Sequence, residues 1–306
     1  MKLAVIFPGQ GSQYVGMAKD FYEKFDKSKY IIDRANTALE YDLKKIMFEG
    51  PEEELKITYN TQPALLTGSI AIWEVIKDKL NPVAFAGHSL GEYTALVAAG
   101  SISFEDAVRA VHNRGKFMQE AVPVGVGAMA AVLGGDVDKI ENLCRAISVD
   151  EKVVEPANYN CDGQLVVAGH AGAVDEFISK IKETGAKRAV KLPVSAPFHC
   201  SLMKPAQEKM RDYLETVCIK DIDVPVYNNV DAEKENKMEV IKDALIRQVS
   251  GAVRWTRLIE NMIEDGVDTF VEVGAGSVLT GLVKKINKNV SVFNISTVED
   301  LNKLES

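Results

Sequence analysis

The chain has 306 residues, which is enough for one large hydrophobic core or for one core with a smaller second domain. Hydrophobic residues make up 46% and charged residues 26% of the sequence, the ordinary balance of a globular protein, so a disordered chain is excluded. A net charge of −8 argues against nucleic-acid or membrane-surface binding, and no apolar run approaches the about 20 residues that a membrane span needs.

The first part of the sequence alternates short apolar runs with longer helical patterns. The opening run is too short for a signal peptide, so we expect a cytoplasmic protein. Up to residue 121 the pattern predicts a strand at Leu3–Phe7, helices around Met17–Phe25, Tyr30–Glu40 and Thr61–Leu80, a buried strand at Val83–Ala86, and helices at Glu92–Ala99 and from Ser103 to about Ala121.

The rhythm changes at Gly127, where strands become frequent. In order, the pattern predicts a strand at Ala128–Leu133, a helix at Val137–Ile147, strands at Val153–Ala157 and Gln164–Ala168, a helix at Val174–Thr184 and a strand at Ala189–Val194. This βαββαβ order is typical of a ferredoxin-like unit.

The last part returns to the first rhythm. It predicts helices at Lys204–Thr216, Lys237–Val249, Val253–Glu264 and Val278–Ile286, and strands at Val224–Asn228 and Thr269–Val273. We therefore predict an α/β fold. A large α/β-hydrolase-like domain with a parallel sheet comprises residues 1–125 and 196–306, and an inserted ferredoxin-like subdomain comprises 126–195.

The clearest chemical motif is Gly87-x-Ser89-x-Gly91, between the strand at Val83–Ala86 and the helix at Glu92–Ala99. A nucleophile elbow needs this context, because a sharp turn that exposes a serine hydroxyl tolerates only small residues two positions before and after it. The N–H of Leu90 would lie at a helix N-terminus, where it can stabilise a developing oxyanion. The motif alone also fits a simple turn with incidental glycines, but its context favours a nucleophilic serine.

A nucleophilic serine needs a base, and the chain has four histidines. His88 adjoins Ser89 on a tight turn and should point elsewhere, while His112 and His170 fit surface, turn or packing positions. His199 lies in an irregular loop, where catalytic groups gather, and is the predicted base. The adjacent Cys200 is interpreted as a packing residue. No Asp or Glu stands out as a third member, and a backbone or amide carbonyl can orient the imidazole instead.

Several stretches resemble one family in order along nearly the whole chain, the malonyl-CoA:acyl-carrier-protein transacylases. The matching stretches are Phe7-Pro8-Gly9-Gln10-Gly11-Ser12-Gln13, Thr61-Gln62-Pro63-Ala64, Gly87-His88-Ser89-Leu90-Gly91-Glu92-Tyr93, Arg114-Gly115 with Met118, Asn158-Tyr159-Asn160, Phe198-His199-Cys200, Ala244-Leu245-Ile246-Arg247-Gln248 and Glu272-Val273-Gly274-Ala275-Gly276.

The resemblance implies a role for each matching site residue. Ser89 corresponds to the nucleophile and His199 to its base, and the N–H groups of Gln10 and Leu90 correspond to the oxyanion hole. The guanidinium that holds the malonyl carboxylate corresponds to Arg114. The residue whose main-chain carbonyl steadies the histidine corresponds to Gln248. Asn160 is a further candidate site residue whose role the resemblance does not specify, and Phe198 resembles the form associated with malonyl units.

The helix pattern bears on Arg114 independently. This residue falls at the edge of the apolar stripe that includes Ala107 and Met118, whereas Arg109 projects from the opposite face. A guanidinium that faces inward needs an anionic partner or several hydrogen-bond acceptors. Taken alone, a structural carboxylate and a substrate carboxylate fit equally well. Together with the serine motif and the resemblance, the position favours the malonyl carboxylate.

These assignments predict a ping-pong transfer of malonyl from malonyl-CoA to the phosphopantetheine thiol of acyl carrier protein, through an ester on Ser89. The predicted partners are malonyl-CoA and acyl carrier protein, without nucleic acid or membrane. No metal or bound cofactor is required, and the four unpatterned cysteines and scarce histidines do not suggest a zinc site. An acidic carrier needs a local basic patch, for which Lys187, Arg188 and Lys191 are candidates; scattered solvated charges explain them equally well.

Three alternatives remain at this point. A serine esterase or thioesterase would share the elbow but not need Arg114, and would usually show an Asp or Glu before the histidine. A nucleotide- or S-adenosylmethionine-dependent enzyme would use the glycines after Leu3–Phe7 or at Gly274-Ala275-Gly276, which tight turns explain better. A non-catalytic carrier-binding protein would not need the intact Ser89, His199 and Arg114.

Overall fold

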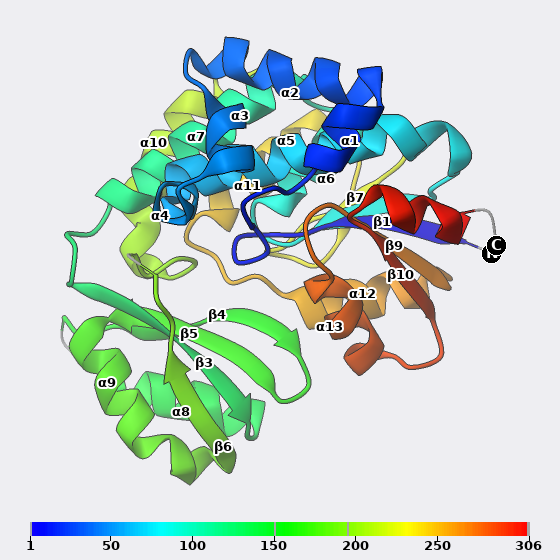
Figure 1. The fold of residues 1–306 in the computed structure, drawn as a ribbon. Helices are drawn as coiled ribbons and strands as arrows, with labels where there is room; N and C mark the ends of the chain where they lie inside the picture. The colour runs from blue at the N-terminus through cyan, green and yellow to red at the C-terminus, as the bar shows by residue number, and fades with distance from the viewer. Residues whose placement is uncertain (1, 150, 195, 305–306) are drawn as a thin grey trace.

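Two β-sheets divide the chain into a larger and a smaller unit (Figure 1). The computed structural model describes residues 2–149, 151–194 and 196–304. The larger sheet has six strands in the order β10-β9-β1-β2-β7-β8, and the smaller has four in the order β4-β5-β3-β6. The predicted α/β class is therefore correct, with a mainly parallel sheet and a second, antiparallel one.

The larger sheet is parallel from β10 to β7, and only the short edge strand β8 runs antiparallel. Its strands are β1 (Leu3–Phe7), β2 (Ala84–Gly87), β7 (Val226–Tyr227), β8 (Lys234–Glu235), β9 (Thr269–Val273) and β10 (Ser291–Ile295). Strand β1 is buried at every residue, as expected for a parallel strand covered on both faces. The carboxyl ends of β1 and β2 lead directly into the Pro8-Gly9 turn and the Ser89 turn.

Helices cover both faces of this sheet, and the strand residues alternate between them. Val5 and Phe7 face one core, whereas Ala4 and Ile6 face another. The helices on the first side are α1 (Lys19–Lys24), α2 (Asp26–Leu39), α3 (Leu43–Glu49), α4 (Glu52–Lys56), α5 (Thr58–Ile76), α6 (Gly91–Ala98), α7 (Phe104–Glu120), α10 (Lys204–Leu214) and α11 (Met238–Gln248). Those on the second side are α12 (Trp255–Glu264) and α13 (Val278–Ile286).

The smaller unit is a four-stranded antiparallel sheet backed by two helices (Figure 1). Its elements, in chain order, are β3 (Gly127–Gly134), α8 (Val137–Ile147), β4 (Val154–Cys161), β5 (Gln164–His170), α9 (Ala171–Lys180) and β6 (Ala186–Lys191). One face of the sheet forms a separate core with α8 and α9, while Met129 and Val166 on the other face pack toward the larger unit.

Several elements differ from the sequence prediction. The last strand of the smaller unit is β6 (Ala186–Lys191) rather than Ala189–Val194, because Pro193 has no N–H for a ladder and the pairing with β3 begins earlier, at Ala186. The prediction also missed α3, α4, β8 and β10. Each of these is short, so its stability comes from tertiary packing rather than from a readable local pattern.

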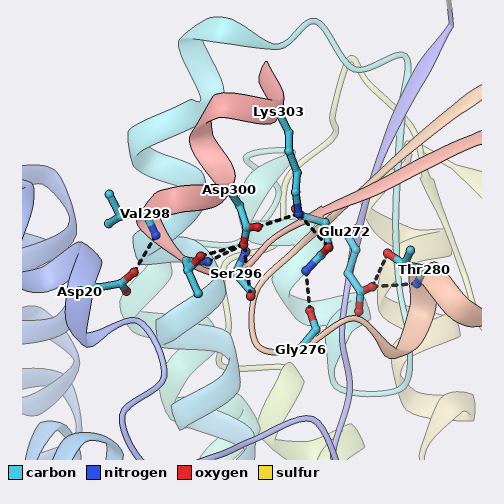
Figure 2. A network of polar contacts seen from close by, with 10 residues as sticks. Asp20, Glu272, Gly276, Thr280, Ser296, Val298, Asp300 and Lys303 are labelled. Carbon is cyan, nitrogen blue, oxygen red and sulfur yellow. Dashed lines mark hydrogen bonds and ion pairs between the residues drawn. The ribbon is translucent and has the colours of Figure 1, made fainter. Parts of the chain in front are cut away.

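Polar contacts fix the C-terminal segment and the start of α13 (Figure 2). The Asp300 carboxylate accepts from the backbone N–H of Ser296 and Thr297, and Asp20 accepts from Val298, which ties the last 3₁₀ helix (Val298–Leu304) to α1. Glu272, buried at the end of β9, accepts from the N–H groups of Leu279 and Thr280. The first turn of α13 is thereby held beside the carboxyl end of the sheet.

Helices α5 and α7 approach each other closely at Gly115. A Cβ at this position would lie 2.6 Å from the Tyr59 Cα and 2.9 Å from the Thr58 carbonyl oxygen. No side chain fits there, so the backbones themselves are in contact. This contact brings Arg114, the neighbour of Gly115, against Gln62 of α5.

In the described part of the chain no helix is both long and apolar enough to cross a membrane.

We expect Gly115→Ala to lower the free energy of unfolding by about 1–3 kcal/mol, because the added methyl overpacks the contact between α5 and α7. Gly281→Ala is the matched control: Gly281 is also helical, and its Cβ would meet nothing within 4 Å. This control should gain about 0.5–1 kcal/mol from helix propensity. Urea denaturation measures both values. Equal changes in the two variants would show that the contact does not restrict Gly115.

Candidate active site

A cavity of about 210 Å³ opens between the two units, at the carboxyl ends of β1 and β2. Ligands in open α/β sheets bind at this edge. Both units contribute polar and apolar side chains to the wall, and the charged and ionisable groups, Arg114, His88 and His199, come from the larger unit. The cavity residues include Gly9, Gln10, Gln62, His88, Ser89, Arg114, Met118, Met129, Asn160, Val166, Leu192, Phe198, His199, Leu279 and Leu282. Five of the seven predicted site residues line this cavity: Gln10, Ser89, Arg114, Asn160 and His199. The other two, Leu90 and Gln248, adjoin these residues.

Ser89 occupies a strained turn between β2 and α6. Its φ is 54°, in the left-handed region that non-glycine residues rarely adopt. The flanking glycines are required, because a Cβ at Gly87 would lie 1.9 Å from the Gly91 carbonyl oxygen, and one at Gly91 would lie 2.3 Å from the Phe7 carbonyl oxygen. This geometry projects the Ser89 hydroxyl into the cavity, as a nucleophile elbow does.

The Ser89 hydroxyl is paired with His199. Its Oγ lies 2.7 Å from Nε2 of His199. Nδ1 of the same ring lies 3.0 Å from the carbonyl oxygen of Gln248 and 3.1 Å from that of Gly251. Two carbonyls can only accept, so Nδ1 carries the proton and Nε2 is free to accept the proton of Ser89. The arrangement is a serine–base pair oriented by main-chain oxygens instead of a carboxylate.

Burial and a neighbouring cation keep His199 neutral. The ring is 4% exposed, and desolvation together with the positive charge of Arg114 lowers its pKa to about 3. The other histidines have different partners: His88 Nε2 binds Asn160 Oδ1, His112 Nδ1 lies 2.8 Å from the Tyr59 carbonyl, and His170 accepts from the Val153 N–H. Cys200 is buried, and its thiol pKa is raised to about 12, so it supplies no thiolate.

Arg114 is a buried guanidinium held by neutral oxygens. It is 1% exposed and donates to Gln62 Oε1 and Gln248 Oε1, each at 2.8 Å, and to Ser89 Oγ at 3.2 Å. Among the residues that the structure describes, no carboxylate forms an ion pair with it. Arg114 therefore presents a positive charge next to Ser89 that a small anion in the cavity can neutralise.

Gln248, at the end of α11, contacts each of these groups. Its main-chain carbonyl accepts from His199, and its side-chain oxygen accepts from Arg114. Its amide nitrogen donates at 2.9 Å both to the Ser89 carbonyl and to Glu92 Oε2. The side chain is fully buried, so these bonds fix the orientation of the amide.

Two backbone N–H groups, of Gln10 and Leu90, lie where the turns after β1 and β2 meet. Within the described residues neither has a hydrogen-bond acceptor, although their neighbours in both turns do. Leu90 is buried and Gln10 is exposed. Both residues flank the Ser89 turn, so their N–H groups are available to a ligand oxygen at Ser89. Leu90 also precedes the first turn of α6, whose dipole adds to the effect.

His88 and Asn160 form a second polar pair on the cavity wall. Their side chains are 2.9 Å apart, and Asn160 comes from β4 of the smaller unit. This hydrogen bond is the direct polar link between the elbow and the smaller unit. The packing of the His88 ring on Trp255, 5.5 Å between ring centroids, completes its surroundings.

Four residues near the serine were given no role by sequence reasoning: Gln62, Glu92, Asn229 and Gly251. Gln62 and Glu92 lie in stretches that resemble the transacylase family, and this was the only sequence signal for them. No sequence signal pointed to Asn229 or to the carbonyl of Gly251. Glu92 is fully buried, and burial raises the pKa of its carboxyl to about 7, although Oε2 accepts from Gln248 and from the Asn229 N–H.

The three basic candidates for carrier docking do not share one face. In the pairing with β3, Lys191 stands opposite Ala130 and Arg188 opposite Leu133, so they point to opposite sides of the sheet. Lys191 also forms an ion pair with Asp175 of α9. The three basic residues of β6 therefore do not form one continuous basic patch. Within the described ranges, no group of three or more His, Cys, Asp or Glu side chains is placed to hold a metal ion.

Comparisons with known proteins agree with this geometry. The acyl transferase domain model matches residues 5–303. The chain is 48% identical to malonyl CoA-acyl carrier protein transacylases of Staphylococcus aureus (strain MRSA252) and Bacillus subtilis (strain 168), over 98% of this chain and 97% and 95% of theirs. The acyl carrier protein S-malonyltransferase of Vibrio cholerae superimposes with a TM-score of 0.97 at 45% identity, covering 99% of this chain and 100% of that one.

A malonyl-transacylase solved in complex with its type II PKS acyl-carrier protein is similarly close, with a TM-score of 0.96 and 44% identity over 99% of both chains. These matches extend over nearly the full length, as the sequence motifs did. The chain therefore belongs to the acyl transferase family and lies among its malonyl CoA-acyl carrier protein transacylases.

Proposed function

We propose that this protein is an acyl carrier protein S-malonyltransferase, which moves malonyl from malonyl-CoA to the phosphopantetheine thiol of acyl carrier protein. The observation that carries the proposal is the unpaired Arg114 guanidinium 3.2 Å from the Ser89 hydroxyl, which itself is 2.7 Å from His199. A nucleophile–base pair next to a fixed cation suits an acyl group that ends in a carboxylate. The names of the relatives agree with this substrate.

In the first half-reaction, Ser89 attacks the thioester carbonyl while its proton moves to Nε2 of His199. The new bond joins Oγ to the carbonyl carbon, and the N–H groups of Gln10 and Leu90 receive the oxyanion. The carbon–sulfur bond then breaks, and His199 returns the proton to the CoA sulfur. The carbonyls of Gln248 and Gly251 hold the ring and stabilise its protonated form.

In the second half-reaction the carrier thiol enters the same cavity. His199 removes its proton, the sulfur attacks the malonyl ester, and Ser89 leaves with the proton from His199. The enzyme requires no metal or bound cofactor in this sequence, because the CoA thioester is itself the activated substrate. A cytoplasmic location follows from this substrate pair. Asn160 lines the cavity, where we expect it to contact the thioester substrates.

Arg114 links selectivity to reactivity. Its charge is one of the causes that lower the pKa of His199. A malonyl carboxylate that pairs with Arg114 neutralises this charge, so the base becomes stronger as the correct substrate binds. Acetyl leaves the guanidinium unpaired in a buried site and gains neither effect.

The chain is divided into two structural domains in this proposal. We assign residues 1–125 and 196–306 to an α/β-hydrolase-like domain and 126–195 to a ferredoxin-like subdomain. The strand–serine–helix turn on a parallel sheet supports the first, and the βαββαβ order with antiparallel pairing supports the second. Residues 1, 195, 305 and 306, at the proposed limits, lie outside the described residues.

The intact protein, incubated with malonyl-CoA and quenched, should gain the mass of one malonyl group. Ser89→Ala should show no adduct, because the ester oxygen is absent, and added holo acyl carrier protein should discharge the wild-type adduct. Intact-protein mass spectrometry measures all three. Release of free malonate without transfer to the carrier would instead identify a thioesterase.

Replacing Arg114 by alanine should reduce kcat/KM for malonyl-CoA by about 100- to 10,000-fold, the loss expected for two charge-assisted hydrogen bonds. The rate with acetyl-CoA should change little, so the preference for malonyl collapses. Arg109→Ala on the exposed face of α7, where Arg109 pairs with Asp106, is the control and should keep wild-type values. Parallel losses for malonyl and acetyl in Arg114→Ala would contradict a carboxylate clamp.

The pH profile tests the state of His199. Its pKa is lowered to about 3, far below the ordinary value of 6.5, so the ring stays neutral as the pH falls through 6.5. The rate of acylation by malonyl-CoA, as kcat/KM, should therefore be nearly constant from pH 8 to about pH 5. Circular dichroism at each pH verifies that the protein remains folded. A tenfold drop per pH unit beginning near 6.5 would show that the ring is as basic as an exposed histidine.

A further inference from the structure

One side chain, that of Asn229 just beyond the end of β7, binds the backbone of the Ser89 turn at two points. Nδ2 of Asn229 donates to the Gly87 carbonyl at 2.8 Å, and Oδ1 of the same amide accepts from the Ser89 N–H at 2.6 Å. The first bond is buried and the second is partly buried, and Asn229 itself is 0% exposed. The two ends of one amide group thus bind the carbonyl that precedes the turn and the N–H of Ser89 at the same time.

The position of Asn229 explains why this side chain reaches the turn. Strand β2 pairs with β7 up to Ala86 and Tyr227, and the chain then leaves the sheet to form the turn. Asn229 lies two residues beyond Tyr227 on the neighbouring chain. On the β7 side its amide takes the place of the ladder hydrogen bonds beyond Ala86, so the strained φ of Ser89 is fixed where pairing with β7 has ended.

Asn229 is itself anchored at both ends of its backbone. Its N–H donates to Glu92 Oε2 at 2.8 Å, and its carbonyl accepts from the Arg254 N–H at 2.9 Å. Glu92 belongs to the first turn of α6, directly after the serine turn. The segments before and after Ser89 are therefore tied to the same residue.

We propose that Asn229 is a positioning residue that holds the Ser89 turn in its strained conformation, so that Oγ meets His199 and the Leu90 N–H faces the reacting carbonyl. The inference rests on the proposed role of Ser89 as nucleophile. Asn229 does not contact Arg114 or line the cavity, so it sets the reactivity of the serine and leaves the choice of acyl group unchanged.

The neighbouring Asn228 offers a matched control. It is also buried, at 1% exposure, and its side chain also makes two hydrogen bonds, to Glu235 Oε2 and from the Asp231 N–H. Those bonds stay within the turn between β7 and β8. Each Asn→Ala variant removes one buried and one partly buried hydrogen bond, but only Asn229→Ala removes the bonds to the Ser89 turn.

The test measures serine reactivity with two reagents. Phenylmethanesulfonyl fluoride forms an Oγ–sulfur bond, releases fluoride and passes the serine proton to the base, and it carries no malonyl group. We expect Asn229→Ala to slow sulfonylation of Ser89 and single-turnover acylation by malonyl-CoA by about 100-fold each, the scale for a misplacement near 1 Å. The KM for malonyl-CoA and the malonyl-to-acetyl preference should stay at wild-type values. Asn228→Ala should react within threefold of wild type, although its melting temperature should fall by about as much as that of Asn229→Ala.

Equal reactivity of folded Asn229→Ala and wild type, or equal losses in both alanine variants, would overturn the proposal. If Asn229→Ala does not fold, Asn229→Asp and Asn228→Asp make the same comparison, because the aspartate keeps the acceptor for Ser89 but presents an oxygen to the Gly87 carbonyl. Wild-type protein that is sulfonylated but takes no malonyl would refute the proposed function, while the sulfonylation rates would still decide the role of Asn229.

Discussion

The geometry of the site depends on one buried neutral residue, Gln248. Its main-chain carbonyl binds His199. Its side-chain oxygen binds Arg114, and its side-chain nitrogen binds the Ser89 carbonyl and Glu92. A carboxylate at the same place would orient the histidine equally well, but it would also form an ion pair with the guanidinium. Because the Gln248 side chain is a neutral amide, it binds Arg114 without cancelling its positive charge, and that charge stays available to a substrate.

This use of neutral acceptors has an energetic consequence. A buried guanidinium without a counter-ion is costly, and here the cost is reduced by two glutamine oxygens and by the more distant Glu92. The remaining cost is relieved when an anion enters the cavity. In the proposed reaction the carboxylate of malonyl provides that relief next to the nucleophile, where selectivity is most effective.

The position of the cavity between two units explains how one nucleophile can serve two thiols. The larger unit carries the serine, the base and the arginine, whereas the smaller unit contributes an apolar wall through Met129, Val166 and Leu192. Direct contacts between the units fix this wall. Val253 forms two backbone hydrogen bonds with β4 across the boundary: its carbonyl accepts from the Tyr159 N–H, and its N–H donates to the Ala157 carbonyl. Glu155 accepts from both the N–H and the hydroxyl of Ser201, two residues after His199. The base is therefore held in place partly by the smaller unit.

Local patterns in the sequence were sufficient for much of the fold. Apolar runs of strand length and helical spacing located β1, β2 and β9 and most long helices, and the βαββαβ order was readable although β6 was placed three residues late. Short elements such as β10 and α4 were missed, because a parallel edge strand or a five-residue helix exists only through the neighbours it packs on.

The sequence by itself determined that Ser89 sits in a sharp turn, because two glycines surround it, and elimination among four histidines predicted His199 as its partner. The structure places the two side chains within hydrogen-bond distance. Tertiary structure alone decided what holds these groups. Gln62, Asn229 and Gly251 act through amides and a main-chain carbonyl, groups that are present throughout the chain and have no local signature. They meet Arg114, Ser89 and His199 across 52 to 140 residues of sequence, and only the packing of the strands and helices determines which of many such groups arrive there.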